Sequence, residues 1–461
     1  MVTALALIAL TLFGFMCLMS LFKPHWALVL VFSFLAYEQL ITSIVAPLAR
    51  RSWIINVTAA GFAGLALLSA MMMGRKPFRG LKNPNTFLIA FLYLFAYFGV
   101  TYSMAPDAAH YFVKTGLPYM ALMLVIFPQL VCSQEQIKRM CLPVLVIGCA
   151  LMGLIFISPR TQFYGSRMFI DLSYTVGGDS KGNPLAIAEF GGILVIVGSL
   201  MDQRAKNVLV SLLRMTAILL GIAIAFLVGS RGQLVFSVFV SVLFYPLAHE
   251  IKNIKQFFFR AASLGVFSLF LFILAKTVLF ASAATERFSS QDIADGINGR
   301  MYFYTETLNA YFSRPGSFLQ GIGTGSFNAV VPHGQEGFLY PHNLVIEVLA
   351  HHGLIGFSAL MLIFLFTMVH SIGLIRAGFR GTVDRSVAAI VIALGVYMTM
   401  LAFKQGSFLI IPFPFYMYLV ISKIYQRMVL DSRESAYLYE EEADYGEYED
   451  YGYDQELEPA E

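Results

Sequence analysis

The sequence predicts an all-α, polytopic membrane protein with about 12–14 transmembrane helices, and three observations support this fold class. Of the 461 residues, 58% are hydrophobic and only 13% are charged, whereas soluble domains carry about 25% charged residues. The mean hydropathy is +0.71. Apolar runs of roughly 20 residues recur along the chain, and they lack the alternation with polar residues that marks the strands of a membrane β-barrel.

Thirteen apolar runs are the candidate membrane spans. They cover residues 2–22, 26–47, 54–73, 86–102, 111–131, 140–158, 185–200, 208–228, 232–248, 261–281, 354–374, 386–403 and 408–425. The first run has no basic segment before it and no clear cleavage site after it, so we expect a retained helix rather than a signal peptide.

Lysine and arginine are concentrated in one set of loops, which sets the expected orientation. Nineteen of the 31 basic residues fall in this set and in the C-terminal tail, counting the nearby Arg214 and Lys423, and we assign the set to the cytoplasm. Its loops are 23–25, 74–85, 132–139, 201–207, 249–260 and 375–385. The long segment 282–353 then lies on the outer, periplasmic face. Arg50 and Arg51 also fall outside, against the usual bias.

The C-terminal tail has its own composition. From Asp431 to Glu461 there are 13 acidic residues and one basic residue, Arg433. Because this segment carries −12 and the whole chain carries +3, the rest of the chain carries +15. Tyrosines alternate with the acids and glycines of this tail (Tyr437, Tyr439, Tyr445, Tyr448, Tyr451 and Tyr453). Such a segment cannot bury a core, so we expect a disordered tail that is either only solvated or used for docking or tyrosine phosphorylation.

These features divide the chain into four parts. They are an N-terminal transmembrane bundle (1–281), a large periplasmic catalytic loop (282–353), C-terminal transmembrane helices (354–425) and the acidic, tyrosine-rich cytoplasmic tail (426–461).

Two arginines at the outer face are candidates for binding an anion. Arg231 lies in the tight corner VGSRGQL between two apolar runs, where a charge is costly unless it is paired or faces a polar cavity; interface snorkelling is the alternative. Arg300 follows an expected Asn298–Gly299 turn and precedes an expected helix. A guanidinium suits diphosphate because its planar fork donates two bonds, although Arg300 can instead form a surface ion pair with Asp295 or Glu306.

Four of the eight histidines lie between residues 298 and 357, and His342 is the most informative. Pro341 precedes it, so we expect His342 to open the helix into the next span, at the membrane–water boundary. A neutral imidazole there can accept a proton from a hydroxyl near neutral pH, and simple anchoring at the interface is the open alternative. We expect His351 and His352 to be secondary, and nothing favours His333.

Glycines and cysteines carry less information. Gly321, Gly323 and Gly325 in GIGTGSF fit a sharply turning backbone that another group approaches closely, with no sign of a nucleotide fingerprint. The four cysteines, which lie in or beside apolar segments, fit small buried hydrophobic residues (Cys17, Cys132, Cys141 and Cys149). No spacing of His and Cys supports a metal site, and we expect no cofactor.

Four motifs in the order found here make the chain resemble the superfamily of O-antigen ligases and O-antigen polymerases. They are GNP (Gly182–Pro184), SRG (Ser230–Gly232), the block GR…PGSFLQGIGTGSF (Gly299–Phe327) and HNLVIEVLAHHGLIGF (His342–Phe357). The match covers roughly residues 180–360. One departure is Tyr304, which stands where the family usually has tryptophan.

The resemblance implies an inverting, metal-independent glycosyltransferase of the GT-C type at the periplasmic face of a bacterial inner membrane. It implies that Arg231 and Arg300 bind the diphosphate of an undecaprenyl-diphosphate-linked glycan and that His342 deprotonates the acceptor hydroxyl. Asn343 and Glu347 are possible orienting residues for His342, and Arg167, in the outer segment 159–184, and Gly323 are further possible supporting residues.

Three functions remain open at this point. The acidic tail favours polymerisation of repeat units of an exopolysaccharide, capsule or O-antigen, with a chain-length regulator or a tyrosine kinase as the partner of the tail. Ligation of finished glycan to lipid A-core, or transfer to protein hydroxyls, uses the same chemistry. A transporter or flippase without catalysis is a different class, which predicts paired broken helices at the bilayer midplane. We expect no nucleic-acid partner.

Overall fold

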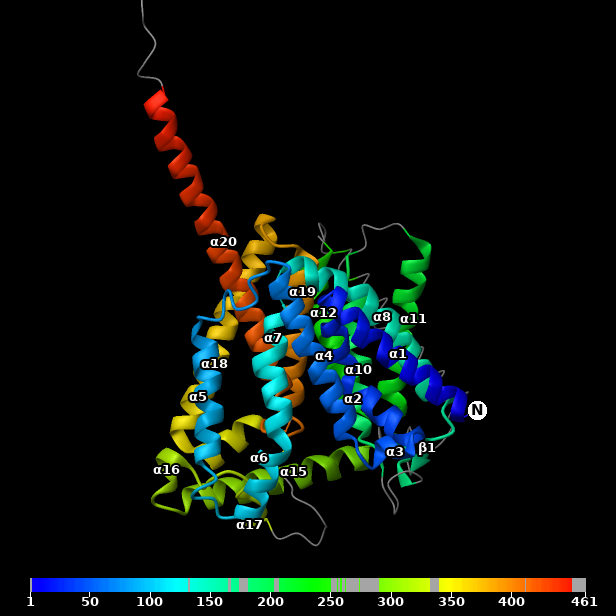
Figure 1. Cartoon of the computed structure of the whole chain (residues 1–461). Helices are drawn as coiled ribbons and strands as arrows, with labels where there is room; N and C mark the ends of the chain where they lie inside the picture. Colours follow the sequence, from blue (N-terminus) through cyan, green and yellow to red (C-terminus); the bar gives the residue numbers. More distant parts are fainter. Residues whose placement is uncertain are drawn as a thin grey trace, which may run out of the picture.

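The computed structural model confirms an all-α membrane fold (Figure 1). It describes residues 2–131, 133–164, 167–173, 181–202, 207–249, 290–331, 340–410 and 412–449, together with the isolated positions 255, 258, 262 and 273. Side chains of α20 are described as far as Ser432.

Helices account for nearly all regular structure in the described residues. The helices of the first half are α1 (Val2–Phe22), α2 (His25–Ile44), α3 (Ala46–Ala49), α4 (Trp53–Met72), α5 (Pro84–Phe98), α6 (Pro106–Met120), the π-helix η1 (Ala121–Ile126), α7 (Phe127–Leu130) and α8 (Gln134–Ile157). Those of the second half are α10 (Pro184–Leu200), α11 (Val208–Leu227), α12 (Arg231–Ala248), α15 (Ser290–Phe312), α16 (Ser317–Gln320), α17 (Phe327–Val330), α18 (Leu344–Arg380), α19 (Arg385–Ala402) and α20 (Phe413–Glu449). An antiparallel hairpin of β1 (Thr161–Tyr164) and β2 (Arg167–Ile170) packs against α2, α8 and α10.

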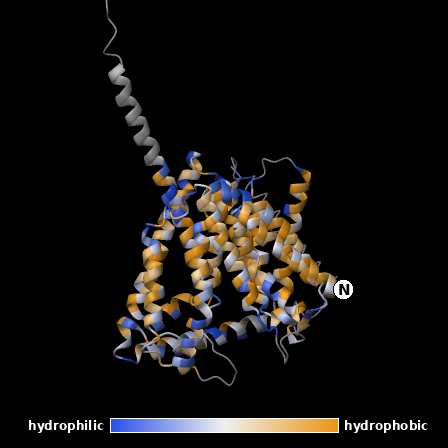
Figure 2. Ribbon diagram, in the orientation of Figure 1, coloured by the Kyte–Doolittle hydropathy of each residue, from blue (hydrophilic) through white to orange (hydrophobic). Residues whose placement is uncertain are grey.

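The apolar runs of the sequence coincide with these helices. Nine helices among the described residues are long and apolar enough to cross a membrane, and α5 and α10 are shorter apolar helices. Twelve of the thirteen predicted runs fall on described helices, whereas the run at 261–281 lies outside the described residues except for positions 262 and 273. Hydrophobic residues fill the middle of the bundle and hydrophilic residues gather at its two ends (Figure 2). The chain is therefore a multi-pass membrane protein.

Helix α10 forms the centre of the bundle. Every residue from Ala186 to Leu200 is buried, and α10 packs against α8, α11, α12 and α19. Glycine permits a close contact between α10 and α11, because a Cβ on Gly191 would lie 2.9 Å from the carbonyl oxygen of Gly221. Small residues allow the backbones of membrane helices to approach each other in this way.

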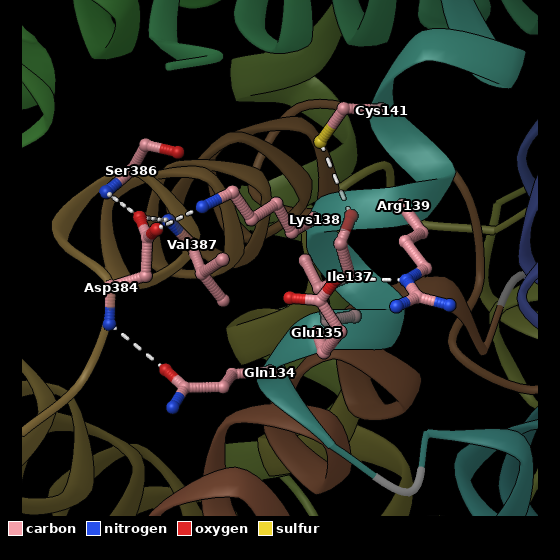
Figure 3. Close-up of polar contacts among 9 residues, drawn as sticks. All are labelled: Gln134, Glu135, Ile137, Lys138, Arg139, Cys141, Asp384, Ser386 and Val387. Atoms are coloured by element: carbon pink, nitrogen blue, oxygen red, sulfur yellow. Dashed lines mark hydrogen bonds and ion pairs between the residues drawn. The ribbon is translucent and has the colours of Figure 1, made fainter. Parts of the chain in front are cut away.

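Four of the basic loops, 23–25, 74–85, 132–139 and 375–385, contribute described residues to the end of the bundle from which α20 projects (Figure 1). His25, Arg75 and Arg427, from three separate elements, line one hollow of about 410 Å³ at this end. The hydrogen bonds in Figure 3 join α8 to the start of α19, since Lys138 Nζ lies 2.9 Å from Asp384 Oδ2 and the backbone N–H of Asp384 donates to Gln134 Oε1 at 2.9 Å. These four loops are grouped as predicted, the loops 201–207 and 249–260 lie mostly outside the described residues, and the membrane face that the group occupies stays a prediction.

Helix α15 crosses the opposite end of the bundle (Figure 1). It includes the helical run predicted after Arg300, but it begins earlier than expected. The predicted turn at Asn298–Gly299 is wrong, because both residues lie inside this 23-residue helix. Asn-Gly favours turns only as a local preference, and here the contacts of the flanking residues with α16, α17 and α18 override it.

The glycine-rich segment after α15 is attached to a break in α18. Gly353 has φ +60° and ψ −161°, which interrupts the helix and frees carbonyl groups in the turn before it. The backbone N–H of Ile322 donates to Ala350 O at 2.9 Å, and that of Gly323 donates to His351 O at 3.0 Å. The loop therefore satisfies the carbonyls that the broken helix leaves unbonded.

Helix α20 carries the acidic tail away from the bundle (Figure 1). It starts in the last predicted span and continues as helix to Glu449, while residues 450–461 lie outside the described residues. The projection agrees with the prediction that this segment buries no core. Its helical backbone extends into the part that the sequence predicted to be disordered, and the disorder beyond it stays a prediction.

Two glycine substitutions should have opposite effects on stability. Gly299 lies in α15, and a methyl group added there would have no atom within 4 Å, so Gly299→Ala should stabilise the protein by roughly 0.5–1 kcal/mol. Gly323 has φ +91°, and its Cβ would lie 2.5 Å from the Cα of Ser103, so Gly323→Ala should destabilise it by about 2 kcal/mol or more. The thermal midpoints of the two variants in detergent, compared with wild type, test both signs; equal midpoints would contradict the packing described for this loop.

Candidate active site

Arg231 is brought to the end of the bundle that α15 crosses by a tight corner between two helices. Helix α11 ends at Leu227, Gly229 takes φ +68°, and α12 begins at Arg231. The side chain is partly buried and extends towards α15, where its Nη2 lies 3.6 Å from the point that a Cβ on Gly296 would occupy. Arg231 therefore lies against α15.

Arg300 lies one helical turn further along α15. Residues 296, 300 and 303 follow one another at intervals of four and three, so they share one face of the helix. Neither Asp295 nor Glu306 forms an ion pair with Arg300 in the part of the chain that the structure describes. The same face of α15 thus carries Arg300 and the contact point of Arg231.

His342 completes this group from the start of α18. Its ring stacks on Phe303 of α15 with 6.2 Å between ring centroids and 16° between planes. Tyr340 covers it from another side at 4.5 Å between centroids. Phe303 is one turn beyond Arg300 on α15, so the imidazole that stacks on Phe303 lies beside the turn that carries Arg300. The structure brings together Arg231, Arg300 and His342, which are far apart in sequence.

The backbone at His342 has an unusual conformation. With φ +61°, His342 is the one non-glycine residue with positive φ among the described residues. A left-handed conformation costs an L-residue roughly 1–2 kcal/mol. Asn343 follows as the N-cap of α18, its Oδ1 accepting from the backbone N–H groups of Val345 and Ile346. His342 was predicted to be the first residue of the helix, but it lies one residue before the N-cap Asn343. The direction of its side chain is therefore not set by the helical backbone.

The surroundings of His342 keep its imidazole neutral. Burial, and after it the positive charge of Arg300, lower the pKa of His342 to about 4. A neutral ring has one nitrogen available to accept a proton. Near neutral pH the side chain is therefore in the form that a general base requires.

Asn343 and Glu347 support the segment that carries His342. The Nδ2 of Asn343 donates to the carbonyl of Phe403 at 3.3 Å, and the buried carboxylate of Glu347 accepts from Ser407 Oγ and from the backbone N–H of Phe408. Among the described residues, the hydrogen bonds of Asn343 and Glu347 go to the start of α18 and to the α19–α20 connection. None of these bonds involves the imidazole of His342. They can position His342 only through the backbone.

Other predicted residues lie outside this group or act in packing. His351 Nε2 accepts from the backbone N–H of Phe327 at 3.2 Å, and His352 is fully buried, so both are structural. Gly323 packs backbone against backbone, as the prediction of a close approach required. Arg167 begins β2, in the hairpin that packs on α2, α8 and α10. His333 lies outside the described residues.

Lys404 is a residue that the sequence reasoning missed. It follows α19, and its Nζ lies 3.4 Å from Gln233 Oε1 in the first turn of α12, two residues after Arg231. Gln233 in turn donates to Gln405 Oε1 at 2.8 Å. The signal was available in the sequence, because Lys404 falls in a short connection that the sequence places on the outer face, where the orientation bias disfavours basic residues. Among the described residues no group of three or more His, Cys, Asp or Glu side chains can hold a metal ion.

Residues 216–361 match the sequence model of the family described as O-antigen ligase. This segment is an O-antigen ligase domain. It runs from within α11 to within α18 and contains Arg231, Arg300 and His342, whereas Lys404 lies beyond it. The matching family comprises membrane glycosyltransferases of the ligase and polymerase type, and the family implies lipid-linked glycans as substrates. No curated protein matches the chain.

Arg300 should control the protonation of His342. Because its positive charge disfavours the imidazolium, Arg300→Met should raise the pKa of His342 from about 4 towards the ordinary value of about 6.5, although burial keeps it below that value. Diethyl pyrocarbonate acylates neutral imidazole, so the pH dependence of the modification rate of the His342 peptide, followed by mass spectrometry, reports this pKa. The exposed Arg314→Met is the matched control and should leave the midpoint unchanged; the same midpoint in Arg300→Met and wild type would contradict the assignment.

Proposed function

We propose that this protein transfers a glycan from undecaprenyl diphosphate to a sugar hydroxyl at the periplasmic face of the membrane. The observation that carries the proposal is the convergence of two arginines and one neutral histidine on a single face of α15. Pairs of guanidinium groups bind diphosphate, and a neutral imidazole beside them accepts a proton. These are the two tasks that such a transfer requires.

In this proposal Arg231 and Arg300 bind the diphosphate of the donor. The acceptor oxygen attacks the anomeric carbon, and the bond between that carbon and the diphosphate oxygen breaks, with its electron pair leaving on undecaprenyl diphosphate. Attack opposite the leaving group inverts the anomeric centre. Charge develops on the diphosphate as the bond breaks, and cationic donors already aimed at it stabilise that charge. The two guanidinium groups thus supply the charge that a divalent cation supplies in nucleotide-dependent transferases.

His342 accepts the proton of the attacking hydroxyl. A pKa of about 4 makes it a weak base in the empty site. A bound diphosphate adds negative charge beside Arg300, which offsets the repulsion that the guanidinium exerts on the imidazolium. Donor binding therefore raises the pKa of His342 and strengthens the base when the donor is present. This coupling disfavours acceptor activation without a donor.

For the acceptor, we propose the growing end of a second lipid-linked glycan, so that the enzyme polymerises repeat units. The acidic tail supports this choice, because α20 carries it at the end of the bundle opposite to α15. A segment in that place suits a chain-length regulator or a tyrosine kinase on the cytoplasmic side. Ligation of finished glycan to lipid A-core is the second candidate, favoured by the description of the matching family as O-antigen ligase.

Removing the imidazole should abolish transfer. His342→Ala and His342→Gly should each lower kcat by roughly 10²–10⁴-fold in nanodiscs supplied with undecaprenyl-diphosphate-linked repeat units, because both lose the general base. His342→Gly also relieves the positive φ and should be more stable than His342→Ala by about 1 kcal/mol. Product length on gels and released undecaprenyl diphosphate by mass spectrometry measure turnover. The exposed His110→Ala is the control, and unchanged turnover in both His342 variants would remove His342 from the mechanism.

Replacing the guanidinium by an ammonium should also be severe. Arg231→Lys keeps the charge but loses the planar fork, so we expect kcat/KM for the donor to fall by about 10²-fold with normal membrane insertion. Arg314→Lys, on an exposed side chain of the same segment, should remain at the wild-type value. Near-normal turnover of Arg231→Lys would count against the clamp. Movement of the lipid-linked glycan across the bilayer without release of undecaprenyl diphosphate would instead favour a flippase.

A further inference from the structure

Lys404 occupies a specific place beside the first turn of α12. The lysine is the second residue after α19, and its chain lies over Gly232, the residue next to Arg231. Its Nζ also lies 3.4 Å from Gln233 Oε1. The ammonium group is thus held at the turn that begins with Arg231.

Gly232 provides the space for this lysine. A Cβ on Gly232 would lie 2.5 Å from Nζ, 2.6 Å from Cδ and 2.9 Å from Cε of Lys404. Real Cβ contacts are longer than this, so any other residue at 232 displaces the lysine chain. Gly232 has no positive φ, and a glycine in a helix costs about 1 kcal/mol relative to alanine. The backbone conformation at position 232 therefore does not require glycine. The reason for a glycine here is the close approach of the Lys404 side chain.

Two amide side chains fix the direction of the ammonium. Gln233 Oε1 accepts from Ser230 Oγ as well as from Lys404, and its Nε2 donates to Gln405 Oε1 at 2.8 Å. Gln233 is fully buried, so its amide cannot rotate freely into water. The network links the start of α12 to the end of α19 and presents Lys404 on the same corner as Arg231.

We infer that Lys404 is a third cation of the diphosphate site, positioned by Gly232 and Gln233. This inference rests on the proposed function, since it assigns a further residue to the same donor. Arg231 extends from this turn towards Gly296 of α15, while Lys404 approaches the turn from α19, so a diphosphate there is contacted from two directions. A lysine ammonium is a compact, rotatable donor that complements the planar fork of an arginine. The orientation bias disfavours basic residues on the outer side of the membrane. A lysine on that side is therefore expected to have a role other than setting the orientation of the protein.

The first test measures binding of a short diphosphate probe. Lys404→Met should weaken the affinity of the purified full-length protein for farnesyl diphosphate by roughly ten- to a hundredfold, the usual loss for a hydrogen bond to a charged group. Its affinity for farnesol should not change. Lys404→Arg should retain part of the affinity, and the exposed Lys114→Met should bind as wild type. Wild-type affinity in Lys404→Met, with an unchanged thermal midpoint, would overturn the inference.

The second test asks whether Gly232 acts through Lys404. Gly232→Ala should raise KM for the lipid-linked donor about as much as Lys404→Met does, with a smaller effect on kcat. In the double variant the two losses should not add, because the alanine displaces a lysine that is no longer present. Additive losses would show that Gly232 acts independently and would overturn its positioning role.

The two proposals fail in different ways. If His342→Ala and Arg231→Lys abolish transfer but Lys404→Met leaves probe affinity and KM unchanged, the proposed function stands and the third cation is wrong. If no variant affects transfer while Lys404→Met still weakens the binding of farnesyl diphosphate, the anion site stands and the proposed reaction is wrong.

Discussion

The contact between the glycine-rich loop and the break in α18 is the constraint on which the site depends. Hydrogen bonds from Ile322 and Gly323 occupy the carbonyls of Ala350 and His351, and a Cβ on Gly353 would lie 2.3 Å from the carbonyl of Leu319. Backbones this close leave little freedom to slide or rotate. The first turns of α18 are thereby fixed relative to the loop that follows α15, and His342 is fixed relative to Arg300.

The chemistry of the site follows from charge and burial acting on one imidazole. Phe303 and Tyr340 cover the ring of His342, and Arg300 adds positive charge beside it. Both effects disfavour the imidazolium, so the empty site keeps a neutral but weak base. In the proposed mechanism, the same positive charge attracts the diphosphate, and the bound diphosphate reverses part of this effect. Substrate binding and activation of the base would then be coupled by electrostatics.

The two ends of the bundle use basic residues in different ways. At one end, basic side chains lie in exposed loops, and the ion pair of Lys138 with Asp384 joins α8 to α19. Such charges orient a membrane protein and need little precision in placement. At the other end, Arg231 and Lys404 lie on one helix corner, where Gly232 makes space for the lysine chain. Close packing distinguishes these two cations from the first group.

Local patterns in the sequence determined the membrane fold and named three candidate site residues. Apolar runs report partition into lipid, which depends on composition within about 20 residues, and twelve runs fall on described helices. The resemblance supplied roles for Arg231, Arg300 and His342, but no local pattern placed them together. Asn298–Gly299 was misassigned as a turn for the same reason, since a short-range preference yields to packing.

The tertiary structure alone decided the contact of Arg231 with α15, the positive φ of His342 and the space that Gly232 leaves for Lys404. Each depends on backbone distances between helices that are remote in sequence, and those distances are set by how whole helices pack. The sequence determines which side chains are present, whereas the distances between these side chains are set only when the helices pack together.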